Sequence, residues 1–270
     1  MQLSVVIVSY NTKELTLDCI DSVFKHSSGV DVELVVVDNG STDGSVQALR
    51  KLKADKLKLI ENTKNLGFAK AVNQAVKASS GEQVLLLNSD CKIKQGALNK
   101  LIDFAQSSPD AGVIGAKLLN PEGDSQPSCY FLPGILRAAK RYFGGVNEVD
   151  KYYPKGSAAS EVEAVVLAAV LITRVALTRV GLLDERYFMY FEDLDFCKRA
   201  RRLGLKVYFL PSAEVVHYHG ASGRDIADSA NQWRRLIPSS KIYHGVLKHY
   251  LIFAIMWLGQ KWEKLLKKGV

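Results

Sequence analysis

Three stretches in the first ninety residues are continuously apolar and rich in β-branched side chains. They are Leu3–Ser9, Val32–Val37 and Gln83–Leu87. A strand whose positions do not alternate between polar and apolar is typical of a sheet that is covered on both faces. The pattern therefore predicts three buried neighbouring strands.

Around these strands, apolar residues recur at helical spacing. This spacing predicts helices over Glu14–His26, Ser45–Leu52 and Phe68–Ala78. Strands that alternate with helices predict right-handed crossover connections. The expected fold is α/β, with a mostly parallel central sheet flanked by helices, and such sheets bind ligands beyond the carboxyl ends of their strands.

Polar side chains follow each of the three predicted strands. Tyr10 and Asn11 follow the first, a run rich in Asx and glycine begins at Asp38 after the second, and Asn88 and Asp90 follow the third. One such cluster is commonly an ordinary turn. Three clusters at one edge of a sheet favour a ligand site.

A second polar pattern lies near the middle of the C-terminal half. The aromatic run Tyr187–Phe191 leads directly into Glu192, Asp193 and Asp195. Acids behind aromatic residues are typical of the rim of a pocket, where burial can tune one carboxylate to act as a base. The alternative is a helix N-terminal charge cluster that the helix dipole favours, with Asp195 paired to Arg199. The pattern by itself leaves both interpretations open.

Taken in order, these segments resemble the successive motifs of the family 2 glycosyltransferases, in particular the bacterial rhamnosyltransferase-like branch. The motifs are SVVIVSYN, VVVDNGSTDGS, NLGFAKAVNQA, LLLNSD, DERYFMYFEDLDFCKRARRLG and PSAEVVHYHG, and they occupy roughly residues 3–222. The resemblance implies a single nucleotide-sugar-binding domain of GT-A type over residues 1–225. Residues 1–115 would form its nucleotide-binding half and residues 116–225 its acceptor and catalytic half.

The resemblance also implies which residues bind the donor. Asp38 is expected beside the nucleoside, and Asn65 and Gly67 in a loop that closes over the nucleotide. The glycine could equally serve only as a helix-entry turn. The full set of expected donor-binding residues is Ser9, Tyr10, Asn11, Asp38, Asn65, Gly67, Asn88 and Asp90.

The expected cofactor is a divalent metal, Mn²⁺ or Mg²⁺, that neutralises the donor diphosphate. By resemblance, Asp90 and His217 hold this ion. Asn88 stands where the family has the first acid of an Asp-x-Asp motif, and a neutral amide is a weaker ligand, so contact with ribose or water is the alternative for Asn88. His219 has the same strand parity as His217 and competes for the metal role.

The family's Glu-Asp motif assigns the general base to Asp193, with Glu192 as the second candidate. A single displacement assisted by one base gives inversion at the anomeric carbon. The first hypothesis for the donor is dTDP-L-rhamnose, and for the acceptor a lipid-linked or growing cell-surface glycan. Two alternatives are a non-catalytic sugar-nucleotide-binding subunit and a basic membrane-binding module.

The C-terminal residues 226–270 form a predicted helical extension that is basic and amphipathic. The net charge of the chain is +8, and residues 197–270 hold 14 Lys and Arg against 4 Asp and Glu. Ile242–Leu258 is largely apolar, but its longest uncharged stretch, Tyr250–Gln260, is too short to span a bilayer. We expect peripheral contact with an anionic membrane. Packing on the catalytic core or on a second subunit, as a homodimer, is the alternative, and no motif predicts binding to nucleic acid.

Two further features concern location and acceptor. The four cysteines form no CxxC pair and the chain opens without a signal-peptide pattern. Reduced thiols and a cytoplasmic protein at the inner face of the membrane are therefore expected. The loop-rich stretch Asn120–Ser160 precedes a predicted strand, Glu161–Thr173, and is a candidate acceptor-recognition insert.

Overall fold

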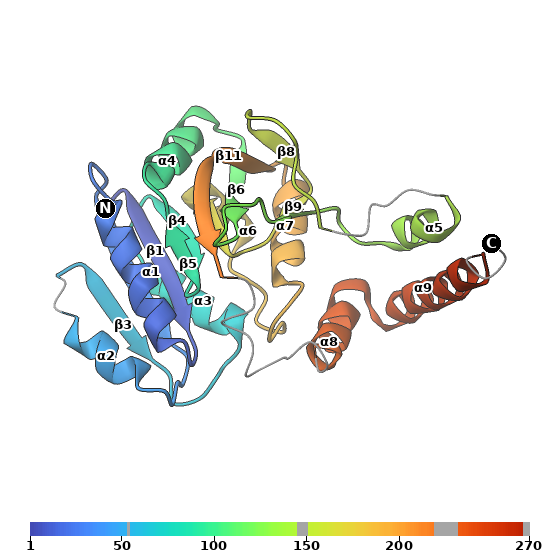
Figure 1. Cartoon of the computed structure of the whole chain (residues 1–270), viewed down its shortest axis with the longest axis horizontal. Helices are drawn as coiled ribbons and strands as arrows, with labels where there is room; N and C mark the ends of the chain where they lie inside the picture. Colours follow the sequence, from blue (N-terminus) through green and yellow to red (C-terminus); the bar gives the residue numbers. More distant parts are fainter. Residues whose placement is uncertain (53–54, 145–150, 219–231, 267–270) are drawn as a thin grey trace.

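The protein is built around a mixed sheet, shown in Figure 1. The computed structural model describes residues 1–52, 55–144, 151–218 and 232–266. Within these residues the sheet has nine strands in the order β3-β2-β1-β4-β10-β6-β11-β5, and β8 pairs with β11 beside this path.

The first half of the sheet is parallel. It consists of β1 (Leu3–Ser9), β2 (Val32–Asp38), β3 (Leu57–Glu61) and β4 (Gln83–Asn88), with β1 between β2 and β4. The three predicted strands are confirmed to within one residue. Their carboxyl ends lie at one edge of the sheet, because parallel strands end on the same side.

The second half of the sheet is mixed, because antiparallel pairings join the parallel ones there. Strand β10 (Ala169–Thr173) runs antiparallel to both β4 and β6 (Ala111–Leu119). Strand β11 (Lys206–His217) is parallel to β6 and antiparallel to β5 (Cys91–Ile93). The predicted boundary between the nucleotide-binding half and the acceptor half, between residues 115 and 116, falls within β6.

The single strand predicted over Glu161–Thr173 is wrong in extent. The segment forms β8 (Ser160–Val162), β9 (Ala164–Val165) and β10. Each piece has a different partner: β8 pairs with β11, β9 with β7 (Cys129–Tyr130) in a separate two-stranded sheet, and β10 with β4 and β6. A continuous apolar run does not reveal where the chain changes partners.

Helices cover both faces of the sheet (Figure 1). Buried side chains of α1, α2 and α4 share one core with Val5 and Ile7, and those of α3, α6 and α7 share the other with Val6. Neighbouring positions of β1 thus point into opposite cores, which explains why the strand is apolar throughout. The bounds are α1 Lys13–Lys25, α2 Ser45–Lys51, α3 Phe68–Ala78, α4 Ala97–Ser107, α6 Arg174–Val180 and α7 Glu192–Arg202.

Three further helices lie together on one side of the molecule (Figure 1). They are α5 (Ile135–Phe143), α8 (Trp233–His244) and α9 (Val246–Leu266). Helix α5 comes from the loop-rich insert and packs along α9, a pairing that we did not predict. The predicted boundary between residues 225 and 226 lies outside the described residues. In the described part of the chain, no helix is both long and apolar enough to cross a bilayer.

Candidate active site

A cavity of about 500 Å³ opens at the carboxyl ends of β1 and β4, against the segment that leads into α7. This volume lies in the range of small-molecule sites. It is bounded on its other sides by residues of the insert and by the end of β11. The predicted site residues that line it are Tyr10, Asn65, Gly67, Asn88, Asp90, Glu192, Asp193 and His217.

The other predicted donor residues lie beside the cavity and order its loops. The Ser9 hydroxyl is 2.8 Å from that of Thr16, and the Asn11 side-chain oxygen accepts a hydrogen bond of 2.8 Å from the Thr42 amide. Asp38 Oδ1 accepts one of 2.9 Å from the amide of Ser41, whereas its buried Oδ2 has no hydrogen-bond partner among the described residues. A buried carboxylate oxygen without a partner lowers the stability of the fold, so this oxygen is a candidate to accept a hydrogen bond from an N–H group of a ligand.

Asn39 lines the cavity and was missed by the sequence analysis. Its Nδ2 donates to Asn65 Oδ1 at 3.0 Å, and its Oδ1 accepts from Asn62 Nδ2 and from the Leu66 amide, both at 3.1 Å. One side chain thus fixes the loop that carries Asn65. The only signal in the sequence was its position directly after Asp38 in the second motif.

Gly67 is required by a close approach as well as by its backbone conformation. Its φ is +88°, and a Cβ there would lie 2.8 Å from the carbonyl oxygen of Phe188. The next residue, Phe68, donates its amide to the same carbonyl at 2.8 Å. The glycine therefore does more than start α3, because it lets the segment before α7 pack against the loop that precedes α3.

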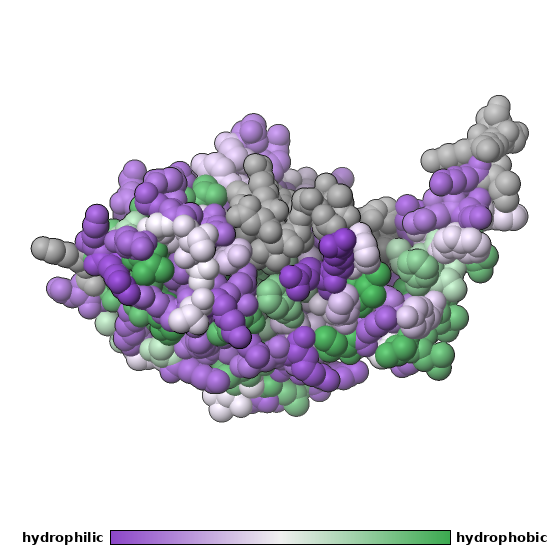
Figure 2. Space-filling model, turned by 90° about the horizontal axis from the view of Figure 1, so that it is seen from below, coloured by the Kyte–Doolittle hydropathy of each residue, from purple (hydrophilic) through white to green (hydrophobic). Residues whose placement is uncertain are grey.

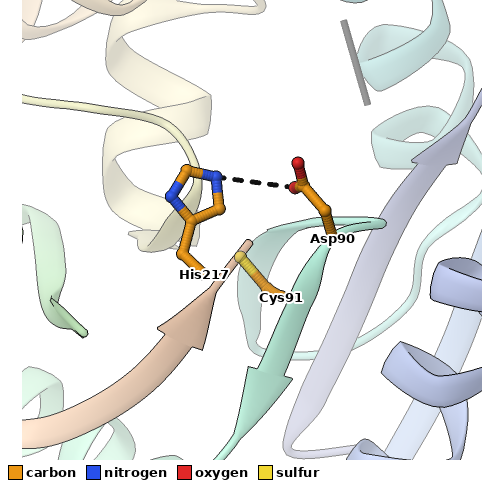
Figure 3. Close-up of side chains that lie close together, drawn as sticks. All are labelled: Asp90, Cys91 and His217. Atoms are coloured by element: carbon orange, nitrogen blue, oxygen red, sulfur yellow. Dashed lines mark ion pairs between the residues drawn. The ribbon is translucent and has the colours of Figure 1, made fainter. Parts of the chain in front are cut away.

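Asp90 and His217 face each other although they come from different parts of the chain (Figure 3). His217 Nε2 is 3.5 Å from Asp90 Oδ1. Gln126 holds the imidazole from behind: its Nε2 donates to the His217 carbonyl at 2.7 Å, and its Oε1 is 2.9 Å from Nδ1. The His217 carbonyl can only accept, so the Gln126 atom that faces it must be the amide nitrogen. The amide oxygen Oε1 therefore faces the imidazole and accepts from Nδ1, which leaves Nε2 toward Asp90.

This arrangement fits a small divalent cation. Such an ion holds its ligands at about 2.1 Å, which puts neighbouring ligand atoms about 3 Å apart. Ligand atoms of Asp90, Cys91 and His217 all lie within 4.8 Å of one another. Cys91 is a poor third ligand, because its thiol donates to the Ala168 carbonyl at 3.4 Å, burial raises its pKa, and small divalent cations such as Mg²⁺ prefer oxygen ligands. His219, the competing ligand, lies outside the described residues.

The two acids of the predicted catalytic pair open α7 behind a strained backbone. Tyr190 and Phe191 have φ values of +70° and +69°. Left-handed conformations of non-glycine residues cost about 1–3 kcal/mol each and persist where the surroundings enforce them. Helix α8 holds this backbone in place. Ser239 donates its hydroxyl to the Met189 carbonyl at 2.8 Å, and the ring centres of Tyr243 and Phe191 are 5.4 Å apart.

Burial raises the pKa of both Glu192 and Asp193, since each charge would lose water. Glu192 is 7% exposed, and its Oε2 has no hydrogen-bond partner among the described residues. Asp193 Oδ1 accepts from the Leu194 amide at 2.8 Å, and the Lys151 ammonium opposes the rise in its pKa. Asp193 is therefore the member of the pair that ionises first.

All three acids lie in the first turn of α7, as the helix-charge interpretation expects, but only the third is paired within the helix. Asp195 Oδ2 accepts from Arg199 Nε at 2.7 Å, one helical turn away. Asp195 does not line the cavity. The three acids thus divide into one partly buried acid that is paired with Arg199 and two that line the cavity.

The far end of the cavity is formed by residues of the insert that the sequence analysis did not single out. Tyr130, Phe131, Pro133 and Lys151 line it, and Lys151 Nζ lies 5.2 Å from the centre of the Tyr130 ring. An aromatic wall with one cation can hold a sugar ring and a nearby negative charge. The insert is thus in contact with the same cavity as the acids.

Comparison with known proteins gives the family. The model of glycosyl transferase family 2 matches residues 4–128. The chain is 32% identical over 222 residues to "N-acetylglucosaminyl-diphospho-decaprenol L-rhamnosyltransferase" of Mycobacterium tuberculosis (strain ATCC 25618 / H37Rv), an alignment that covers 73% of this chain and 70% of the relative. It is 23% identical over 218 residues to "dTDP-rhamnosyl transferase RfbF" of Shigella flexneri, covering 80% and 68%.

Solved structures show the same fold at low identity. Mannosyltransferase PcManGT from Pyrobaculum calidifontis, in complex with GDP-Man and Mn²⁺, has a TM-score of 0.60 at 19% identity over 95% of this chain and 69% of that one. GalNAc-T7 with UDP, GalNAc and Mn²⁺ has a TM-score of 0.65 at 16% identity over 88% of this chain. This chain spans about half the length of the GalNAc-T7 structure, 47%.

The fold is the one that these solved structures share, the GT-A type. The chain belongs to glycosyltransferase family 2, in its rhamnosyltransferase-like branch. The predictions of fold, family and enzymatic class are thereby confirmed.

Proposed function

We propose that this enzyme transfers a sugar, with inversion, from a nucleotide donor to a hydroxyl of a lipid-linked or growing cell-surface glycan. One observation carries the proposal. A single cavity is lined by Asn65, Asn88 and Asp90 at the strand ends and by Glu192 and Asp193 at the start of α7. Donor and base can therefore act in the same enclosed volume.

Asp193 is the general base of the proposed reaction. Its carboxylate takes the proton of the acceptor hydroxyl, whose oxygen bonds to the anomeric carbon of the donor sugar. The bond between that carbon and the diphosphate oxygen breaks, and the diphosphate leaves with the electron pair. One displacement inverts the anomeric carbon. Glu192, whose pKa burial raises further, is the second candidate.

At the donor end, Asp90 and His217 would hold Mn²⁺ or Mg²⁺. A bound divalent ion neutralises charge on the departing diphosphate. The neutral Asn88 is left to contact the ribose. Asp38 Oδ2, which has no hydrogen-bond partner among the described residues, is left to accept a hydrogen bond from the nucleobase, beside the backbone of residues 9–11. Two relatives are named for rhamnosyl transfer, which supports dTDP-L-rhamnose as the donor.

The acceptor is proposed to wait at the cytoplasmic face of the membrane. One relative's name specifies a diphospho-decaprenol acceptor. Leu247, Phe253, Trp257 and Trp262 of α9 are exposed, and Lys261 lies among them. Exposed aromatic and apolar side chains beside lysines are typical of helices that lie in the interface of anionic membranes. The homodimer is the competing proposal for this surface.

The two alternatives to an enzyme are not retained. Membership of the family argues against a basic membrane-binding module as the whole function. The pair of acids in the cavity argues against a non-catalytic sugar-nucleotide-binding subunit, because two carboxyl groups with raised pKa values serve no purpose in holding a negatively charged donor.

The test is hydrolysis and transfer with a panel of nucleotide sugars, with and without Mn²⁺. We expect Mn²⁺-dependent turnover of dTDP-L-rhamnose above UDP- and GDP-sugars. Asp90→Asn should abolish metal-dependent binding of dTDP, and His217→Ala should weaken it by about 10–100-fold. Asp18→Asn, at an exposed acid of α1, is the matched control. Equal dTDP affinity in EDTA and in Mn²⁺ would refute the metal, and no turnover of any donor would refute the function.

A further inference from the structure

Helices α5 and α9 form a specific pair although 102 residues separate the end of one from the start of the other. A Cβ at Gly259 of α9 would collide with the ring of Tyr142 of α5, so only glycine allows this approach. Arg141 Nη1 of α5 also lies 3.5 Å from Glu263 Oε1 of α9. These contacts indicate that the spacing between the two helices is built into the sequence.

A narrow groove of about 70 Å³ runs between these helices. It lies next to the cavity described above, since Phe131 and Pro133 line both. Beyond these two residues its lining is largely aliphatic. The groove side chains from the helices are Arg137, Ala138, Ile252 and Met256.

The charge of the groove is confined to one side chain. Arg137 alone is charged among the described residues that line it. Its guanidinium lies 4.8 Å from the centre of the Phe131 ring and pairs with Glu163. Arg137 does not line the larger cavity, but Phe131, over whose ring it lies, lines both hollows. A ligand that fits both hollows is polar in the cavity, meets the Arg137–Glu163 ion pair near the junction and is apolar in the groove.

The outer surface of the same helices narrows the class of ligand. Hydrophobic side chains gather at the α8–α9 end of the molecule, with hydrophilic ones beside them (Figure 2). Leu136 is 69% exposed and Trp257 50% exposed, and Lys261 lies over the Trp257 ring at 4.5 Å. Lysine is depleted from protein–protein interfaces, whereas tryptophan with lysine is typical of a membrane surface. The surroundings therefore favour a lipid over a second copy of this chain.

We propose that the groove between α5 and α9 seats the apolar chain of an isoprenoid-linked acceptor, an inference that rests on the proposed function. The acceptor sugar then lies beside Asp193, its phosphates near Lys151 and Arg137, and its first apolar units against Ala138, Ile252 and Met256. Each apolar unit that the groove buries adds to the affinity for the acceptor. The groove thus selects acceptors by their lipid and draws them from the membrane toward the base.

The experiment measures binding of farnesyl diphosphate and of inorganic diphosphate to the full-length protein by calorimetry, without vesicles. We expect the isoprenoid to bind at least about 10-fold tighter, the equivalent of roughly two buried methylenes. Ala138→Phe fills the groove from α5, and Ile252→Ser makes it polar from α9. Both should remove the preference, whereas Leu136→Ser, on the same helix but exposed, should retain it.

Three results would overturn the inference. They are equal affinity of the wild type for the two probes, an unchanged preference in both groove variants, and a solution dimer that the groove variants dissociate, which would make the surface an interface between copies. Melting curves check that each variant is folded, and two variants on different helices guard against a failure of one. Donor hydrolysis is measured on the same proteins. Intact hydrolysis without the isoprenoid preference refutes the groove alone. An isoprenoid preference without hydrolysis of any donor refutes the proposed function alone.

Discussion

The donor side and the acceptor side of the cavity differ in how far hydrogen bonds satisfy their polar groups. On the donor side, polar groups at the strand ends satisfy one another, as Asn39 does with Asn65 and Leu66. On the acceptor side, Phe191 has a left-handed backbone and Glu192 buries an oxygen without a partner among the described residues. Both sides carry some cost, since Asn11 on the donor side has a φ of +52° and Asp38 Oδ2 has no partner among the described residues. The acceptor side differs in having two successive left-handed residues directly before the acids of the proposed chemistry.

Helices α3 and α9 show the same contrast in packing. Helix α3 buries six of its eleven residues against the sheet: Ala69, Ala71, Val72, Asn73, Ala75 and Val76. Of residues 246–264 in α9, only His249 and Gly259 are buried. Apolar side chains in α3 stabilise the fold, whereas those on the outer surface of α9 stabilise little until something covers them.

The largest expected effect separates the two sides of the cavity by kinetics. Asp193→Asn should lower kcat by about 10²–10⁴-fold, the usual contribution of a placed general base, and leave donor affinity nearly unchanged. Steady-state transfer assays and calorimetry with dTDP measure the two quantities. Glu192→Gln is the matched control on the neighbouring acid. Near-normal turnover of Asp193→Asn, or a larger loss in Glu192→Gln, would move the base to Glu192.

A smaller effect tests the contrast between the helices. Val72→Ala removes two buried methyl groups and should lower the free energy of unfolding by about 2 kcal/mol, a fall in Tm of about 4–8 °C. Phe253→Ala, on an exposed side chain of α9, should change it by no more than about 0.5 kcal/mol. The same Phe253 variant should bind anionic vesicles more weakly. Thermal melts measure the stability, and co-sedimentation measures the vesicle binding. A strong loss of stability in Phe253→Ala would mean that α9 packs on the fold and stabilises it.

How far the sequence predicts this molecule follows from the range of its interactions. Strand β1 and helix α3 were predicted with their observed bounds, because a periodic pattern within one segment reports its own burial. The run over Glu161–Thr173 has the same composition but divides among three partners. Which strands pair depends on both segments, so the pattern within one segment does not predict its partner.

The site shows the same limit residue by residue. The motifs identified Asp90, Asp193 and His217, and the structure brings all three to one cavity. Gln126 orients His217 across 91 positions of the chain, and no local pattern marks it. The pairing of α5 with α9 was missed for that reason too, since Gly259 gains its meaning only from the Tyr142 ring opposite.

The smallest expected effect concerns the charge balance across the cavity. Burial raises the pKa of Asp193, and the Lys151 ammonium opposes that rise. The base must be ionised to act, so activity falls as the pH drops through the pKa of Asp193. Removing the cation in Lys151→Met should raise this pKa and move the acid limb of the kcat profile to higher pH, by up to about one unit.

The direction of that shift decides what Lys151 does. Lys151→Arg keeps the charge and should leave the limb where it is in the wild type, because arginine stays protonated throughout the range. Rates well above the pKa should agree among the three proteins, since Asp193 is then ionised in all of them. If instead Lys151→Met weakens acceptor binding and leaves the limb unmoved, the lysine contacts the acceptor phosphates without affecting the base. A limb displaced to lower pH would contradict both roles, because loss of a nearby cation cannot stabilise a carboxylate.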